Sequence, residues 1–221
     1  MPRSDELTTT SYAILGLLAL RDWSTYELAQ QMQRSMRLWW PRAESRVYEE
    51  PKRLARLHLA RTRDEGVGAR PRTVYSITDE GREALRAWLG EPTGIFRLEF
   101  EAMVKVFFAD QGSKSQLLAN IASIRDAAVG DLEKDQGFVR EYAESGGPFP
   151  ERLHIIGLAT DLYARLLQAT LDWADDAAAE VSTWRSTRTA PDPTHLLAAR
   201  LRDGDRPDAD AAEAVDREPS A

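Results

Sequence analysis

The pattern of apolar and polar positions in the first half of the chain predicts a series of helices. Residues 11–20 are apolar on nearly every side, which is typical of a buried helix, and the hydroxyl groups of residues 8–11 are candidate N-caps. After a short link, Ser24 and Glu27 have the spacing of a capping box, so a second helix is expected to begin there. Apolar residues between positions 28 and 32 form one face of that helix.

A third helix is predicted after Pro41, and it is rich in arginine and lysine. Val47, Leu54 and Leu57 fall on one helical stripe between these basic residues. Pro51 lies inside the stretch, where a proline removes a backbone hydrogen bond and costs roughly 3 kcal/mol. The sequence therefore predicts either a kink at Pro51 or a helix that begins late.

Residues 59–77 predict a β-hairpin. Turn-forming residues fill positions 64–69, and β-forming residues alternate over positions 73–77. Thr78 is a good N-cap for a fourth helix, because two acidic residues follow it in the first turn. Three helices followed by a hairpin are the parts of a winged helix-turn-helix, in which one helix enters the major groove of DNA and the hairpin contacts the backbone beside it.

The second half of the chain predicts helices only. Apolar residues between Phe96 and Phe108 form one amphipathic helix, which starts after Pro92. Ser113 caps a second helix that extends as far as Tyr142. A turn at residues 146–148 then leads to the last helix.

The predicted fold class is mainly α: an N-terminal winged helix-turn-helix of three helices plus a β-hairpin wing, followed by an all-α domain. We expect a DNA-binding domain over residues 1–90 and a helical dimerisation and effector domain over residues 91–189. Few large apolar residues follow position 190, so residues 190–221 are expected to be an acidic, disordered tail.

The net charge of −7 argues at first against a partner as acidic as DNA, but the charges are unevenly distributed. Residues 34–72 hold eleven Arg or Lys against five Asp or Glu, a local charge of +6. Residues 1–90 carry 15 basic and 12 acidic side chains, or +3, which leaves −10 for the remainder. A basic patch on an acidic body orients a protein toward phosphates.

Several classes of protein are excluded. Without cysteine there is no disulfide framework, thiolate nucleophile or cysteine metal site. No apolar run approaches the ~20 residues of a membrane span, and the first ten residues lack the pattern of a secretory signal, so we expect a cytoplasmic protein without membrane contact. His58, His154 and His195 are far apart in sequence, and no nucleophile, base and oxyanion donor can be assembled. We therefore expect no metal site, no cofactor and no enzymatic activity.

The candidate DNA-binding residues are mainly arginines and lysines in and around the third helix and the hairpin. Arginine forms bidentate bonds with guanine edges and phosphates, whereas lysine acts as a point charge attracted to phosphate. Ser45 and Arg46 lie near the N-terminus of the third helix, the end expected to reach base edges, and Tyr48 offers its hydroxyl to phosphate or packs its ring. The predicted set is Tyr26, Arg42, Ser45, Arg46, Tyr48, Lys52, Arg53, Arg56, Arg63, Arg70 and Arg72.

Several short segments of the first 90 residues form a specific pattern together. They are residues 12–18 (Tyr-Ala-Ile-Leu-Gly-Leu-Leu), 26–29 (Tyr-Glu-Leu-Ala), 40–41 (Trp-Pro), Ser45, Tyr48, 52–54 (Lys-Arg-Leu) and 70–81, which begins Arg-Pro-Arg-Thr-Val-Tyr. In this order and spacing they resemble the PadR family of transcriptional regulators, and the helical half resembles it more loosely. The resemblance implies a homodimer that is joined through its C-terminal helices, represses promoters and is often released by a small ligand.

The chain departs from the family pattern at two places. Thr25 stands where the family usually has glycine before the second helix, which leaves the geometry of that turn open. Glu49 and Glu50 precede Pro51, whereas the family commonly has proline directly after the tyrosine of the third helix. This second departure predicts two acidic residues beside the DNA.

The last helix, from about Pro150 to Trp184, carries a stripe of residues at alternating three- and four-residue steps. A helix of about 35 residues spans about 50 Å, which is longer than one small domain covers. This length favours a dimer seam over the alternative of an internal bundle core. The predicted dimerisation residues are Ile156, Ala159, Tyr163, Leu166, Thr170, Trp173, Ala177 and Val181.

Aromatic residues suggest a ligand site. A cavity lined by them would suit a flat apolar effector, and ordinary core packing is the alternative. The candidate ligand-binding residues are Trp39, Trp40, Trp88, Phe96 and Phe100.

The sequence leads to the hypothesis of a dimeric repressor that presents two winged helices to a pseudo-palindromic operator, about one helical turn of DNA apart. A small aromatic ligand would change the spacing of the two recognition helices and release the DNA. Two alternatives belong to other classes: a winged-helix module that binds proteins, and a small-molecule-binding protein, both without sequence-specific DNA binding.

Overall fold

The computed structural model describes residues 6–36, 39–40, 44–66, 72–95, 98–190, 192 and 194–198, without the side chains of residues 44–46. The chain divides into two compact units, Met1–Phe96 and Arg97–Ala221, which we call the N-terminal unit and the C-terminal unit. Among the described residues, no helix is long and apolar enough to cross a membrane.

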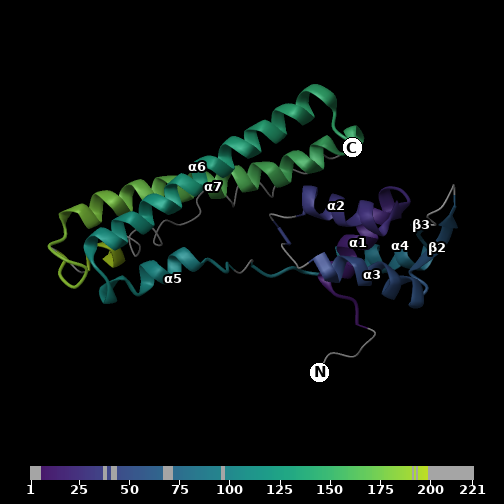
Figure 1. Cartoon of the computed structure of the whole chain (residues 1–221), viewed down its shortest axis with the longest axis horizontal. Helices are drawn as coiled ribbons and strands as arrows, with labels where there is room; N and C mark the ends of the chain where they lie inside the picture. Colours follow the sequence, from purple (N-terminus) through teal and green to yellow (C-terminus); the bar gives the residue numbers. More distant parts are fainter. Residues whose placement is uncertain are drawn as a thin grey trace, which may run out of the picture. The chain divides into compact units, whose positions relative to one another are not determined.

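The N-terminal unit contains the predicted winged helix-turn-helix (Figure 1). The order of helix, helix, helix, hairpin and helix is confirmed, with the addition of a two-residue strand before the second helix. The elements are α1 (Thr9–Leu20), β1 (Trp23–Ser24), α2 (Thr25–Ser35), α3 (Glu44–Arg56), β2 (Ala60–Glu65), β3 (Arg72–Ile77) and α4 (Asp79–Leu89).

Hydrogen-bonded caps fix where these helices begin. Thr8 and Ser11 form a capping box at the start of α1. The predicted capping box of α2 is confirmed: the Ser24 N–H donates to Glu27 Oε2 at 2.8 Å, and the Glu27 N–H donates to Ser24 Oγ at 3.4 Å. Thr78 caps α4, as the sequence predicts.

Five side chains form the centre of the N-terminal core. Ile14, Leu15 and Leu18 of α1, Leu28 of α2 and Leu54 of α3 are each at most 1% exposed. Burying a side chain of this size contributes about 1.5–3 kcal/mol relative to leaving it in water. Helix α3 packs against both α1 and α2, and this packing holds the helix-turn-helix together.

Pro51 lies inside α3 without ending it. The helix runs from Glu44 to Arg56, so the predicted alternative of a late start is wrong. A proline has no N–H to donate to the carbonyl of Val47, one turn earlier. Its ring is fully buried, and the apolar contact it gains in the core offsets the missing hydrogen bond.

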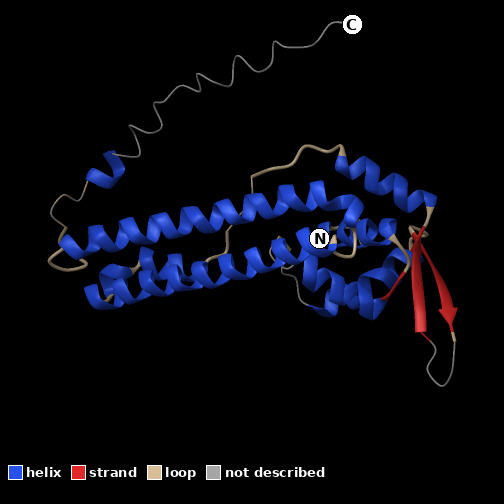
Figure 2. Ribbon diagram, turned by 90° about the horizontal axis from the view of Figure 1, so that it is seen from above, coloured by secondary structure: helices blue, strands red, loops and turns tan. Residues whose placement is uncertain are grey.

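The three strands form one antiparallel sheet in the order β1-β3-β2, so β3 is central. β2 and β3 pair over their whole length, from Ala60 opposite Ile77 to Glu65 opposite Arg72. They form the predicted hairpin, drawn in red in Figure 2. This hairpin is the wing.

Strand β1 is a feature that the sequence does not predict, since residues 21–23 read as a simple link. Trp23 pairs with Tyr75 of β3. Its buried indole donates from Nε1 to the Leu17 carbonyl of α1 at 2.7 Å, and the Arg21 guanidinium lies 3.7 Å from its ring centroid. Trp23 therefore connects α1 to the sheet.

The turn between α3 and β2 is held against the start of α4. His58 has a φ of 59°, in the left-handed region, and its carbonyl accepts a hydrogen bond from Thr78 Oγ1 at 2.8 Å. The Leu59 N–H donates to the Leu54 carbonyl at 2.9 Å. Gly81 approaches this turn so closely that a Cβ at its position would lie 2.1 Å from the Leu59 carbonyl oxygen.

The C-terminal unit is helical, as predicted. Its elements are α5 (Glu101–Phe107), the 3₁₀ turn η1 (Ala109–Gln111), α6 (Lys114–Ser145), the 3₁₀ turn η2 (Pro150–Arg152) and α7 (Leu153–Thr183). The long helices α6 and α7 pack side by side (Figures 1 and 2). Gly146 and Gly147 form the predicted turn between them, with φ angles of 74° and 60°.

Helix α5 is shorter than predicted. The described residues between Pro92 and Phe100 are not helical, and Phe100 itself is extended, with φ −132° and ψ 94°. Apolar spacing suggested a helix here, but Pro92 and Gly94 are the residue types least favourable to one. The helix therefore starts only at Glu101.

The tail predicted to be disordered lies only partly within the described residues. Asp192 accepts a hydrogen bond from the Thr194 N–H at 2.9 Å. His195 Nε2 lies 3.4 Å from a carboxylate oxygen of Glu180 in α7. The prediction for residues 199–221 falls outside the described part of the chain.

Substituting Gly81 tests the close approach of α4 to the turn after α3. Gly81→Ala is expected to lower the free energy of unfolding by about 2–4 kcal/mol, because the new Cβ collides with the Leu59 backbone. Gly16→Ala in α1 is the control, since no atom lies within 4 Å of its added Cβ and alanine favours helix by about 0.5–1 kcal/mol. Chemical denaturation measures both. Equal stability of the two variants would contradict the packing described.

Candidate nucleic-acid interface

Helix α3 has a buried face and an exposed face of different chemistry. Val47 and Leu54 point into the core beside Pro51. Tyr48, Lys52 and Arg56 follow one another at four-residue steps, so they share one side of the helix, and all three are exposed. A phenol, an ammonium and a guanidinium on one exposed stripe suit an anionic partner.

Glu49 lies beside this stripe and pairs with Lys52, whose Nζ is 2.9 Å from Glu49 Oε1. This hydrogen bond is the main cause of the lowered pKa of the Glu49 carboxyl and the raised pKa of the Lys52 ammonium. Both side chains are at least half exposed, so the pair opens readily to another anion.

Glu50, unlike the exposed Glu49, lies on the side of α3 that faces α1. Its Oε1 accepts hydrogen bonds from the buried Ser11 Oγ of α1 at 2.6 Å and from Arg53 Nη1 at 2.8 Å. The sequence predicted two acidic residues beside the DNA. That prediction is wrong for Glu50, because its carboxylate accepts hydrogen bonds that join α1 to α3.

Arg53 was predicted to bind DNA, and the structure gives it another set of contacts. Besides Glu50, its guanidinium donates to Ser11 Oγ at 3.3 Å and to the Glu6 carbonyl at 2.8 Å. The Arg53 side chain is 20% exposed and the Glu50 side chain 14% exposed. We call Ser11, Glu50 and Arg53 the α1–α3 junction.

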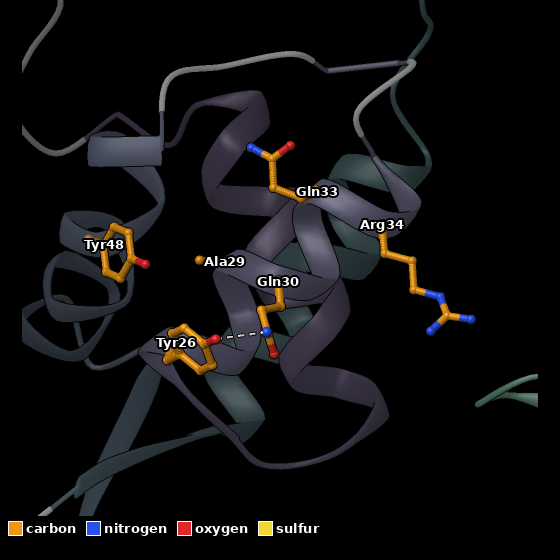
Figure 3. Close-up of a pocket in the computed structure, with 6 residues that line it drawn as sticks. All are labelled: Tyr26, Ala29, Gln30, Gln33, Arg34 and Tyr48. Atoms are coloured by element: carbon orange, nitrogen blue, oxygen red, sulfur yellow. Dashed lines mark hydrogen bonds between the residues drawn. The ribbon is translucent and has the colours of Figure 1, made fainter. Parts of the chain in front are cut away.

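An open groove of about 490 Å³ lies between α2 and α3 (Figure 3). Tyr26 and Tyr48, one from each helix, stand on its two sides, and Gln30 Nε2 donates to Tyr26 Oη at 2.9 Å. Its full lining is Tyr26, Ala29, Gln30, Gln33, Arg34 and Tyr48.

The sequence prediction named the two tyrosines of this groove but missed its glutamines and Arg34. A signal for them exists in the sequence. Positions 26, 30, 33 and 34 recur at helical spacing on the side of α2 opposite the buried Leu28 and Met32. The outer face of α2 therefore carries its polar residues on the same side as Tyr26.

The wing carries the predicted residues Arg63 and Arg72, and both are exposed and paired with acidic residues. Arg63 Nη2 lies 2.7 Å from Glu65 Oε1, and Arg72 Nη2 lies 3.4 Å from Glu65 Oε2. Arg72 also reaches Glu27 at 3.9 Å. The wing is thus joined electrostatically to the first turn of α2.

The pKa of the Glu27 carboxyl is lowered from its usual value. The hydrogen bond from the Ser24 hydroxyl is the largest cause of its lowered pKa, followed by that from the Ser24 N–H, with smaller attractions to Arg72 and Arg21. The negative charge of Glu27 also stabilises α2, because it lies near the positive end of the helix dipole.

Four of the predicted DNA-binding residues lie outside the description. Arg42 and Arg70 are not among the described residues, and the side chains of Ser45 and Arg46 are not described, although their backbone belongs to α3. Their contacts stay predictions.

The aromatic residues predicted to bind a ligand have structural contacts where they are described. Trp88 stacks on Tyr12 of α1, with ring centroids 4.6 Å apart and planes 4° apart. Trp40 Nε1 donates to Thr10 Oγ1 at 2.8 Å. Trp39 and Phe100 are exposed, and Phe96 lies outside the described residues.

The stripe predicted as a dimer seam lies partly in the core of the C-terminal unit. Val181 is buried there with Leu117 and Ile121 of α6, and Trp173 and Ala177 pack against the same cluster. The internal-core alternative therefore describes this end of α7. The others, Ile156, Ala159, Tyr163, Leu166 and Thr170, are half-buried, and Tyr163 Oη donates to Asp131 of α6 at 3.2 Å.

Two separate groups of apolar side chains of the C-terminal unit are exposed in the single chain. The first lies on α7 and consists of Ile155, Leu158 and Leu162, of which Leu158 is 72% exposed; we call it the apolar face of α7. The second lies on and after α5 and includes Val104, Phe107 and Phe108, of which Phe107 is 80% exposed. Exposed apolar side chains at this density are typical of a surface that another protein covers.

In the described parts of both units, no group of three or more His, Cys, Asp or Glu residues is placed to hold a metal ion.

Two protein-family models match the chain, one in each unit. The model described as Transcriptional regulator PadR-like family matches residues 14–87. The model described as Virulence activator alpha C-term matches residues 100–182. The resemblance inferred from short segments of the sequence is therefore confirmed.

Two named regulators are similar to the chain. The Mycobacterium tuberculosis protein called Probable transcriptional regulator Rv1176c is 26% identical over 179 residues, 76% of this chain and 94% of that protein. The Bacillus subtilis protein called Negative transcriptional regulator PadR is 28% identical over 127 residues, 55% of this chain and 70% of that protein. Transcriptional regulators are not enzymes, so these matches confirm the expectation that the chain is not one.

Solved structures share the fold. The crystal structure of Bacillus subtilis PadR in complex with operator DNA has a TM-score of 0.70 at 22% identity and covers 79% of this chain and 99% of that one. The same protein in complex with p-coumaric acid has a TM-score of 0.63 at 20% identity and covers 80% of this chain and 99% of that one. The likeness confirms the predicted architecture of a winged helix followed by a helical domain.

The α1–α3 junction predicts different effects for two arginines of α3. Arg53→Gln removes the ion pair with Glu50. It is expected to lower the free energy of unfolding by about 2 kcal/mol and Tm by about 4–8 °C. Arg56→Gln, at an exposed position one turn later, is the control and should leave Tm within about 1 °C. Calorimetry of the purified variants measures both values. Equal Tm values for Arg53→Gln and the unmodified protein would rule out a structural role for the junction.

Proposed function

Since this chain is a PadR-like transcriptional regulator, we propose that it binds operator DNA as a homodimer and represses transcription. Repression follows if the bound dimer blocks access of RNA polymerase to the promoter. A regulator of this kind works where the chromosome is, which agrees with the predicted cytoplasmic location. That location stays a prediction.

The exposed stripe of Tyr48, Lys52 and Arg56 on α3 is the observation that carries the DNA-binding proposal. In a winged helix-turn-helix the corresponding helix lies in the major groove and the wing lies over the adjacent backbone. Among the described side chains of α3, the exposed cationic ones lie on this stripe. The opposite face of the helix is in the core and cannot reach a partner.

Each residue of the interface is assigned a contact by its chemistry. Lys52 and Arg56 neutralise phosphates, and Tyr26 and Tyr48 donate their hydroxyls to phosphate oxygens from the two sides of the groove. Ser45 and Arg46 stand at the helix end that reaches base edges, where arginine reads guanine. Arg42 and Arg70 are proposed phosphate contacts on sequence grounds alone.

The exposed apolar face of α7 supports a homodimer. Ile155, Leu158 and Leu162 lie at three- and four-residue steps on α7, which is the pattern of a helix that packs against another. An identical face on a second copy covers it by two-fold symmetry. Such a dimer presents two α3 helices to half-sites about one helical turn of DNA apart.

Regulation by a small aromatic ligand is the last part of the proposal. Bacillus subtilis PadR has been solved with p-coumaric acid, a small aromatic acid. Trp39 of the N-terminal unit and Phe100 of the C-terminal unit are exposed, and each by itself stays a candidate for contact with such a ligand. Phe96 remains a sequence-based candidate, whereas Trp40 and Trp88 are already held by contacts to α1.

DNA binding is tested with a duplex that flanks the protein's own coding sequence, over a series of salt concentrations. Arg56→Gln is expected to weaken binding about 5–20-fold and to reduce the slope of log K against log salt by about one, because one phosphate contact is lost. Arg86→Gln makes the same change of charge on α4 and serves as the control, with an effect below about twofold. Absence of binding by the unmodified protein, or equal effects of the two variants, would contradict the interface.

Dimerisation is tested by light scattering at micromolar concentration. Leu158→Asp places a carboxylate in the apolar face and is expected to give the mass of one chain instead of two. Ala179→Asp, at an exposed position 21 residues further along α7, is the control and should remain dimeric. A dimeric Leu158→Asp protein, or a monomeric unmodified protein, would show that this face is not the dimer interface.

A further inference from the structure

The wing arginines Arg63 and Arg72 are paired with carboxylates in the free protein. Glu65 lies directly opposite Arg72 in the register of β2 and β3, and Arg63 lies two residues earlier on the same face of β2. Both guanidinium groups converge on Glu65, one on each carboxylate oxygen.

Two further acidic residues extend the cluster. Arg63 Nη2 lies 3.7 Å from Asp22 Oδ2, and Arg72 Nη1 lies 3.9 Å from Glu27 Oε1. Three carboxylates thus face two guanidinium groups, and Glu65 alone contacts both. We call these five residues the wing cluster.

The wing cluster is held loosely enough to exchange partners. The side chains of Arg63 and Arg72 are 64% and 54% exposed, and ion pairs between exposed side chains contribute little to stability because water screens them. A DNA phosphate is a competing ligand for the same guanidinium groups, with similar geometry and a stronger field. A DNA phosphate that binds Arg63 or Arg72 either displaces the Glu65 carboxylate or lies beside it and is repelled by its charge.

We infer that Glu65 is an affinity-determining residue, which competes with DNA phosphates for Arg63 and Arg72. The inference rests on the proposed function and adds an opposing group within the same interface. Because the competition involves the DNA backbone alone, it lowers affinity for every duplex by a similar factor and leaves the preference between sequences unchanged. The wing therefore limits total affinity, and the choice of sequence is left to α3.

The test compares Glu65→Gln with the unmodified full-length protein. The probes are the duplex that flanks the coding sequence and an unrelated duplex of equal length. Glu65→Gln is expected to tighten binding to both duplexes about 3–10-fold and to steepen the salt slope by up to about one. Asp64→Asn is the matched control, because Asp64 is the adjacent exposed acid on β2, and its contact is the hydroxyl of Thr73 at 2.9 Å. It should change affinity less than about twofold.

A second comparison separates competition from simple repulsion. In an Arg63→Gln, Arg72→Gln background, adding Glu65→Gln is expected to change affinity less than about twofold, since the contested groups are gone. Tm values confirm that each variant is folded.

Three results would overturn the inference. They are unchanged or weaker binding by Glu65→Gln, an equal gain from Asp64→Asn, and a full gain from Glu65→Gln in the background without the two arginines. Failure of the unmodified protein to bind either duplex is a distinct result, which removes the proposed function and this inference with it.

Discussion

The hydrogen bonds and the ion pair that join Glu50 to Ser11 and Arg53 determine how α3 is presented. Ser11 is fully buried in α1, so its hydroxyl needs a partner, and Glu50 supplies one at 2.6 Å. Arg53 neutralises the carboxylate that this contact draws toward the core. With Glu50 and Arg53 directed inward and Pro51 buried between them, the rotation of α3 is fixed. The remaining side of the helix is then Tyr48, Lys52 and Arg56.

The wing is held to this helix by backbone contacts at the turn after α3. His58 takes a left-handed conformation, Thr78 donates to its carbonyl, and Gly81 leaves room for the Leu59 carbonyl. Trp23 connects the other side of β3 to α1. These contacts place the basic wing and the exposed stripe of α3 in one rigid unit, which is what recognition of two features of one DNA duplex requires.

Features set by neighbouring residues were predictable from the sequence, and features set by distant contacts were not. The capping box of Ser24 and Glu27 needs residues only three apart. The inward direction of Glu50 depends on Ser11, 39 residues earlier, and β1 exists only because β3 lies beside it. Periodicity on α7 predicted a packed stripe but not its partner, since the same spacing serves an internal core and a dimer seam. Val181 belongs to the former.

Hydroxyl-radical footprinting of the full-length protein on the duplex that flanks its own coding sequence tests the central claim most directly. A two-fold dimer that inserts two α3 helices predicts two symmetric protected regions, with centres about 10–11 base pairs apart. Absence of protection, or one asymmetric protected region, would contradict the account.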